Sequence, residues 1–114
     1  MKITVVTKKS NGKPEIVEFE NEIHAYQSYV GGYIECYEVI NGVNFIINED
    51  GEYLHLIPNI VCPEFDAFFV GNIIAAGVDF DERCFVSLTD EQVHKVLEYF
   101  ALNSIVDGKI VRKF

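Results

Sequence analysis

The residue types in this sequence best suited to chemistry are carboxylates, and several of them recur at positions i and i+2. Asp50 and Glu52 form one such pair, and Asp79 and Asp81 another. On an extended strand, side chains two residues apart project to the same side about 6.5 Å apart, close to the spacing of phosphates along one nucleic-acid strand. Such a surface can occupy a nucleic-acid-binding groove, where arginine and lysine of a partner pair with its carboxylates. The acids that we expect to contact a partner are Glu49, Asp50, Glu52, Glu64, Asp66, Asp79, Asp81 and Glu82.

The distribution of charge supports this interpretation. The chain has 114 residues with 18 acids and 9 bases, a formal net charge of −9 and a pI near 4.6. Residues 14–82 contain no lysine or arginine, and both flanks are slightly basic. An acidic chain of this kind does not favour non-specific binding to nucleic acid or to anionic membranes, and its expected partner is a basic protein. The alternative is an ordinary solvated surface, because half-buried strands also place polar residues at i and i+2.

Motifs of common catalytic and cofactor sites do not occur in the sequence, neither a glycine-rich nucleotide loop nor a nucleophile elbow nor a zinc-binding H-E-x-x-H. The acidic segments 48–52 and 79–82 lack the spacing of a twelve-residue calcium loop. We therefore expect a protein without enzymatic activity and without a cofactor, and we assign no metal site. A hydrolase that uses an unrecognised pair of carboxylates is a third hypothesis.

A second hypothesis is a small-ligand or metal-binding domain. It would place Tyr33, Tyr37 and Asn59 around a pocket, together with the three histidines. The histidines are far apart in the sequence, whereas zinc ligands usually include a close pair. These histidines are His24, His55 and His94.

The sequence also predicts a cytoplasmic protein. The apolar run at residues 1–6 is too short for a signal peptide, and the longest apolar tract, residues 67–78, is too short to span a bilayer. Cys36, Cys62 and Cys84 are odd in number and lie in apolar surroundings, so we expect small buried side chains in a reducing compartment.

Local patterns predict two helices. The longer one covers residues 90–103, because Thr89 and Gln92 form a capping box and apolar residues follow on one stripe. A shorter helix is expected from an Asn21 cap to the glycine pair at 31–32.

Strands are predicted at 2–6, 15–20, 33–40, 43–47, 53–57, 68–78 and 84–87, with Asn-Gly hairpin turns at 11–12 and 41–42. The fold class is therefore α+β, a largely antiparallel sheet of hairpins with two helices on one face, the longer near the C-terminus. We expect a single domain at 1–103. Residues 104–114 would be a C-terminal extension, a hairpin or an extended tail able to pair with a second copy in a homodimer.

Five short motifs in a fixed order resemble the bacterial and phage domain of unknown function numbered three-eight-four-six, over residues 2–100. That family implies a small cytosolic protein of Firmicutes, their phages and conjugative elements, with no established activity and so no catalytic residue to transfer. Glu52 and Ile60 stand where similar sequences tend to have a base, and residues 104–114 run beyond the usual end. The motifs are residues 30–35, 48–51, 58–59, 70–71 with 75–79, and 87–93.

Together, the acidic stretch and the resemblance predict a small acidic interaction protein of phage or mobile-element type. We expect it to inhibit a basic nucleic-acid-binding host protein, such as a CRISPR effector or a restriction enzyme. Its acidic surface would take the place of the nucleic acid.

Overall fold

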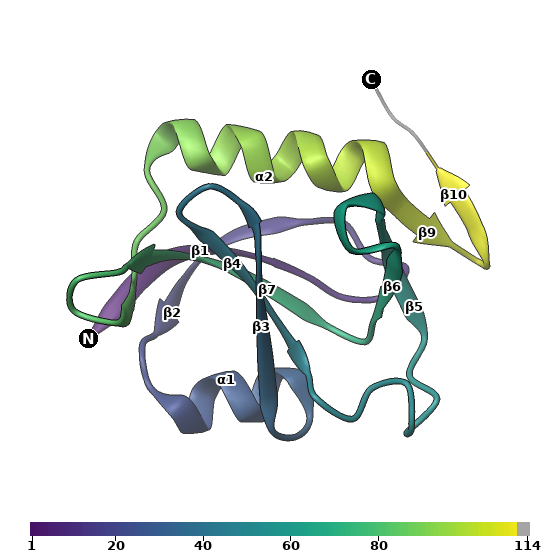
Figure 1. Ribbon diagram of the computed structural model, residues 1–114, viewed down its shortest axis with the longest axis horizontal. Coiled ribbons are helices and arrows are strands. Elements are labelled where there is room, and N and C mark those ends of the chain that lie inside the picture. The colour runs from purple at the N-terminus through teal and green to yellow at the C-terminus, as the bar shows by residue number, and fades with distance from the viewer. Residues whose placement is uncertain (112–114) are drawn as a thin grey trace.

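The computed structural model describes residues 1–111, which form two antiparallel β-sheets and two α-helices (Figure 1). The predicted α+β class is confirmed, with strands arranged mostly as hairpins and the longer helix near the C-terminus. The elements are β1 (Lys2–Lys8), β2 (Glu15–Glu20), α1 (Ile23–Val30), β3 (Ile34–Ile40), β4 (Val43–Asn48), β5 (Pro58–Cys62), the 3-10 helix η1 (Pro63–Phe65), β6 (Ala67–Val70), β7 (Ile73–Asp79), β8 (Cys84–Val86), α2 (Asp90–Asn103), β9 (Ser104–Val106) and β10 (Lys109–Val111).

The main sheet has the strand order β2-β1-β7-β4-β3, and β8 pairs with the second half of β7. The predicted hairpins at both Asn-Gly turns are present, as β1–β2 and β3–β4. Leu88 donates its backbone N–H to the Thr4 carbonyl at 2.9 Å, so the chain after β8 also joins β1. These pairings place β3 and β2 at the two edges of the sheet.

The smaller sheet has the order β10-β9-β5-β6 and lies beside one end of the main sheet (Figure 1). Strand β9 follows α2 without a loop, and Ser104 pairs with Ile60 of β5. The C-terminal hairpin, which the sequence predicted as one of two options, is therefore strands β9 and β10. The remainder of the predicted extension, residues 112–114, lies outside the described residues.

The two helices cover opposite faces of the main sheet, which corrects the expectation that they share one face (Figure 1). Tyr26 of α1 packs in a core cluster with Val5, and Phe100 of α2 packs in a second cluster with Val6. Adjacent residues of a strand point to opposite faces, and in the central strands both are apolar. A helix on one face alone would leave the other apolar face exposed to water, so the sheet needs a cover on each side.

Two predicted strands differ from the structure. The apolar run 68–78 is two strands in different sheets, because Gly71, with a φ of +79°, turns the chain after β6. Residues 53–57 are not a strand but belong to an exposed turn segment, and the strand instead begins at Pro58 as β5. Proline is tolerated at the first position of a strand, where its missing N–H interrupts no ladder.

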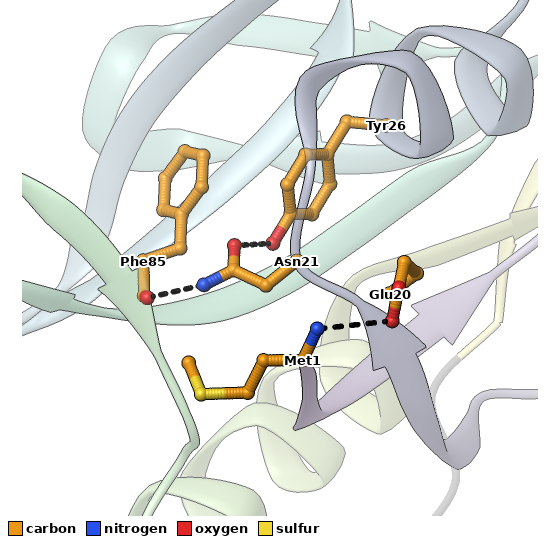
Figure 2. A network of polar contacts seen from close by, with 5 residues as sticks. All are labelled: Met1, Glu20, Asn21, Tyr26 and Phe85. Atoms are coloured by element: carbon orange, nitrogen blue, oxygen red, sulfur yellow. Dashed lines mark hydrogen bonds and ion pairs between the residues drawn. The ribbon is translucent and has the colours of Figure 1, made fainter.

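The start of α1 is also corrected. Its N-cap is Glu22, whose side chain makes no capping hydrogen bond. Asn21 instead links α1 to β8: its Oδ1 accepts from the Tyr26 hydroxyl at 2.6 Å, and its Nδ2 donates to the Phe85 carbonyl at 3.0 Å (Figure 2). In the same view, the Met1 amino group lies 3.5 Å from Glu20 Oε2.

The end of α1 and the start of α2 are as predicted. Gly31 ends α1 with a φ of +84°. Both hydrogen bonds of the capping box between Thr89 and Gln92 are formed at α2.

The cysteine prediction holds for one residue of three. All three thiols are free, but only Cys62 is buried, whereas Cys36 and Cys84 are exposed. Within residues 1–111, the helices are too short or too polar to cross a membrane.

Candidate functional site

A pocket of about 500 Å³ opens where the edge strands of the two sheets meet. Strand β3 is the outer strand of the main sheet and β6 that of the smaller sheet, and the turn segment after β4 closes the pocket from a third side. We call it the acidic pocket. Its lining is Glu35, Tyr37, Ile47, Asn48, Glu49, Asp50, Gly51, Glu52, Tyr53, Phe65, Ala67, Phe68, Phe69 and Val70.

Aromatic rings join the two edge strands below this opening. The Tyr37 ring lies with its centroid 5.0 Å from that of Phe69 and 5.2 Å from that of Phe65. Tyr53 and Phe68 also line the pocket, and their side chains are 84% and 57% exposed. The wall is therefore aromatic, and part of it is open to solvent.

Hydrogen bonds to the backbone fix the position of the acidic segment that lines the pocket. Asn48 is buried at the end of β4, where its Nδ2 donates to the Val30 carbonyl at 3.0 Å. Its Oδ1 accepts from the Asp50 N–H at 2.8 Å, and the Glu49 N–H donates to the Tyr33 carbonyl at 2.8 Å. This turn fixes the backbone of the acidic segment to β3 and to the end of α1.

Four carboxylates line the pocket, from Glu35, Glu49, Asp50 and Glu52, and no lysine or arginine within residues 1–111 belongs to its lining. None of the four lies within 4 Å of a basic group of the described residues, and Glu35 accepts a hydrogen bond from the Tyr37 hydroxyl. Carboxylates bind guanidinium groups through paired hydrogen bonds, and aromatic faces attract cations. The arrangement is suited to a cationic group, arginine above all, since its planar guanidinium uses both.

The structure divides the eight acids predicted to contact a partner. Glu49, Asp50 and Glu52 line the acidic pocket. Asp79 is the last residue of β7, roughly 20 Å from its first residue at the usual rise per residue, and Asp81 and Glu82 follow in the turn before β8. These three acids therefore do not form one surface with the acidic pocket.

The turn between β7 and β8 uses one of its acids internally. Asp79 Oδ1 accepts the backbone N–H of Asp81 at 3.0 Å and that of Glu82 at 3.2 Å. This is the bonding of a solvated turn.

The last two predicted acids flank the aromatic wall. Glu64 and Asp66 lie on either side of Phe65, in and just after η1. The Glu64 Oε1 accepts from the Tyr99 hydroxyl at 2.5 Å, so its carboxylate is directed to α2 rather than left free for a partner. The Tyr99 hydroxyl oxygen also lies 3.3 Å from Cys62 Sγ, and burial raises the pKa of Tyr99.

The strand-like spacing that suggested a nucleic-acid mimic is wrong for the predicted pairs. Asp50 and Glu52 both lie in a turn, Asp81 lies in the turn that follows Asp79 at the end of β7, and Asp66 has a left-handed backbone. Glu18 and Glu20 have the same spacing in the sequence and both lie on the extended strand β2, but neither lines the pocket. Recognition at the pocket must therefore depend on a local cluster and not on a ladder of acids.

Sequence reasoning missed Glu35, Tyr53, Phe65 and Phe68 because the pocket is made by a meeting of two sheet edges. The alternative ligand set does not assemble either: Tyr37 lines the acidic pocket, whereas Asn59 is buried away from its lining. His24 and His94 lie on helices that cover opposite faces of the sheet. In the part of the chain that the structure describes, no three metal-ligating side chains come together.

Comparison with known proteins is consistent with the sequence motifs. A family described as Domain of unknown function (DUF3846) matches residues 1–101, a span that covers both helices up to the last turn of α2 and every strand except β9 and β10. Neither the curated proteins nor the solved structures give a significant match. The chain therefore belongs to the DUF3846 family.

Proposed function

We propose that this protein is a binding protein without enzymatic activity, whose acidic pocket receives an arginine side chain of a basic partner protein. The observation that carries the proposal is the junction of β3 and β6, where four carboxylates and five aromatic side chains line one opening without a basic residue among the described residues. A guanidinium that enters it meets carboxylate oxygens and ring faces together, and partial removal from water strengthens both interactions.

The surface beside the pocket favours a macromolecular partner. Large apolar side chains are exposed on the turn segment next to it, with Leu54 50% and Ile57 57% exposed, as are the rings of Tyr53 and Phe68. Exposed aromatic and apolar groups around a polar centre are typical of protein interfaces, in which a few such residues supply most of the binding energy. The acids then determine which partners are attracted.

For the partner we propose a protein that itself binds nucleic acid, such as a host defence nuclease. Its nucleic-acid-binding groove presents arginines for phosphates, and the pocket offers carboxylates to the same arginines. Occupation of that groove would inhibit the partner. The chain's net charge of −9 supports this choice, because it accelerates the encounter with a positive surface.

The test compares two triple variants with the same change in charge. Glu49→Lys/Asp50→Lys/Glu52→Lys alters the pocket, and Asp79→Lys/Asp81→Lys/Glu82→Lys alters the turn at the far end of β7; both raise the net charge by six. Binding of a nine-residue arginine peptide is measured by calorimetry at two salt concentrations. We expect the pocket variant to weaken binding at least about tenfold more than the turn variant does.

Equal losses in the two variants would show attraction by net charge alone and would contradict a role for the pocket. A Phe65→Ala variant then tests the aromatic wall, since it keeps the net charge and should still weaken binding of the arginine peptide. To identify the partner, the tagged wild type and the pocket variant are used to capture proteins from a bacterial lysate. The proposal requires a basic protein that the wild type captures and the pocket variant does not, and whose binding to DNA or RNA falls when the wild type is added.

A small free cation is the second candidate occupant, favoured by the pocket volume of about 500 Å³, which lies within the range of ligand pockets. Native mass spectrometry of protein purified from cells, before and after addition of a polyamine, tests it. A polyamine that binds the wild type in a one-to-one ratio more tightly than the arginine peptide would favour this role over a protein partner.

A further inference from the structure

A second pocket contains a buried lysine with few partners. Lys8, the last residue of β1, is only 1% exposed, although lysine is rarely buried without a paired acid. Its Nζ donates to Asn59 Oδ1 at 2.7 Å, and no carboxylate of the described residues lies within 4 Å of it. An ammonium has three N–H donors, so this single neutral acceptor leaves most of its hydrogen-bonding capacity unused.

Asn59 holds the lysine in a fixed direction. Its side chain is fully buried, and its Nδ2 donates to the carbonyls of Lys8 and Gly71, both at 2.8 Å. Both carbonyls require a donor, so the amide must present its oxygen to the lysine. The pair therefore positions an ammonium group without neutralising its charge.

Lys8 lines a pocket of about 430 Å³ beside the last turns of α2. This volume lies within the range of small-molecule sites. Among the described residues the lining includes Lys13, whose side chain is exposed, and no acid, in a chain whose net charge is −9. The lining is Lys8, Gly12, Lys13, Pro14, Leu97, Phe100, Ala101, Ser104, Val106 and Val111.

The chemistry of this lining requires two properties of a ligand. Leu97, Ala101 and Val106 offer an apolar surface, which favours a hydrocarbon or aromatic body. The buried ammonium favours an anion, because a charge removed from water is stabilised by an opposite charge that also accepts its hydrogen bonds. Burial lowers the pKa of Lys8, as expected for an ammonium without a counter-ion among the described residues.

We propose that this pocket binds a small carboxylic acid with an apolar body, whose carboxylate accepts hydrogen bonds from Lys8 Nζ while its hydrocarbon part lies against α2. The site is separate from the acidic pocket, and its ligand has the opposite charge. The ligand completes the hydrogen bonding of Lys8 that Asn59 begins.

The experiment uses three probes that divide the ligand into its parts. Octanoate has both the carboxylate and the hydrocarbon chain, acetate only the carboxylate, and octanol only the chain with a neutral head. Binding to the full chain is followed by calorimetry, and ¹³C-detected NMR of the Lys8 ε-methylene reports whether the ammonium is the contacted group. We expect octanoate to bind at least about tenfold more tightly than either of the other probes and to shift the Lys8 signal.

Two variants and one control locate the site. Lys8→Met removes the charge and keeps the length of the side chain, and Ala101→Leu fills the pocket without altering the lysine. Each variant should weaken the binding of octanoate at least about tenfold. Lys9→Met removes the adjacent, exposed lysine, which does not line this pocket, and should bind octanoate as the wild type does.

The variants also keep the test decisive. Circular dichroism checks that each one folds, and Ala101→Leu tests the site even where Lys8→Met does not fold. Octanoate that fails to bind the wild type, or that binds Ala101→Leu unchanged, overturns the proposal. Acetate or octanol that binds as tightly as octanoate overturns it too, because one half of the ligand would then suffice.

Discussion

The two pockets lie on either side of the smaller sheet and differ in the sign and the burial of their charges. The acidic pocket, on the β6 side, has several exposed carboxylates; the lysine pocket, beside β9 and the end of α2, has one buried ammonium. Exposed charges keep their hydration and lose little on folding, so a site can accumulate them. A buried charge destabilises the fold unless polar groups are built around it, as Asn59 is built around Lys8. The first pocket therefore depends on the number of its charges and the second on the geometry of one.

This contrast predicts the largest effect at Asn59. Asn59→Ala removes the acceptor of a buried ammonium and the donors of two buried carbonyls at once. Each buried group left without a partner costs about 1–3 kcal/mol, so we expect the free energy of unfolding to fall by at least about 3 kcal/mol in urea titrations. Asn44→Ala is the control, because the Asn44 side chain forms no hydrogen bond among the described residues. A loss at Asn59 no larger than that at Asn44 would show that water replaces the lost contacts and that Lys8 is not truly buried.

The next effect is a dependence of stability on pH that comes from Lys8. Burial lowers its pKa in the folded chain below the ordinary 10.5. Between the lowered value and 10.5 the unfolded chain binds more protons than the folded one, so the contribution of Lys8 to the free energy of unfolding rises with pH. The slope must stay below about 1.4 kcal/mol per pH unit, the limit for one proton.

The measurement is the difference in unfolding free energy between the wild type and Lys8→Met, from pH 7 to pH 10. Burial raises the pKa of Cys62 and of Tyr26, the latter to about 12, so both groups lower stability as the pH rises through the ordinary range of each. Both are present in the two proteins and cancel in the difference. A difference that stays constant or falls with pH would mean that Lys8 is hydrated in the folded state.

Local interactions explain which parts of the fold the sequence predicts. The capping box at Thr89, the glycine end of α1 and the hairpin turn at 41–42 each depend on residues within a few positions, and all three are present. The division of the run 68–78 depends on which sheet each half joins. That is decided by strands distant in the sequence, so the apolar composition of the run could not show it.

The same distinction separates the two pockets. Glu49, Asp50 and Glu52 are adjacent in the sequence, and their acidic site is visible as a local cluster. Lys8 and Asn59 are 51 positions apart, and each alone resembles an ordinary polar residue. The isolated Asn59 even suggested a different ligand set, because a buried asparagine that supports a lysine has no pattern of its own in the sequence.

The smallest effect on stability is predicted at the acidic pocket, and it completes the comparison. Glu49→Gln/Asp50→Asn/Glu52→Gln removes three exposed charges that form no ion pair among the described residues and keeps the shape of the side chains. The backbone N–H of Asp50, which bonds to Asn48, is unchanged. We expect the free energy of unfolding to change by less than about 0.5 kcal/mol, whereas binding of the arginine peptide should weaken about tenfold. A loss of stability comparable to that at Asn59 would mean that these carboxylates, like the buried lysine, are bonded within the fold, and the acidic pocket would then be a structural feature rather than a binding site.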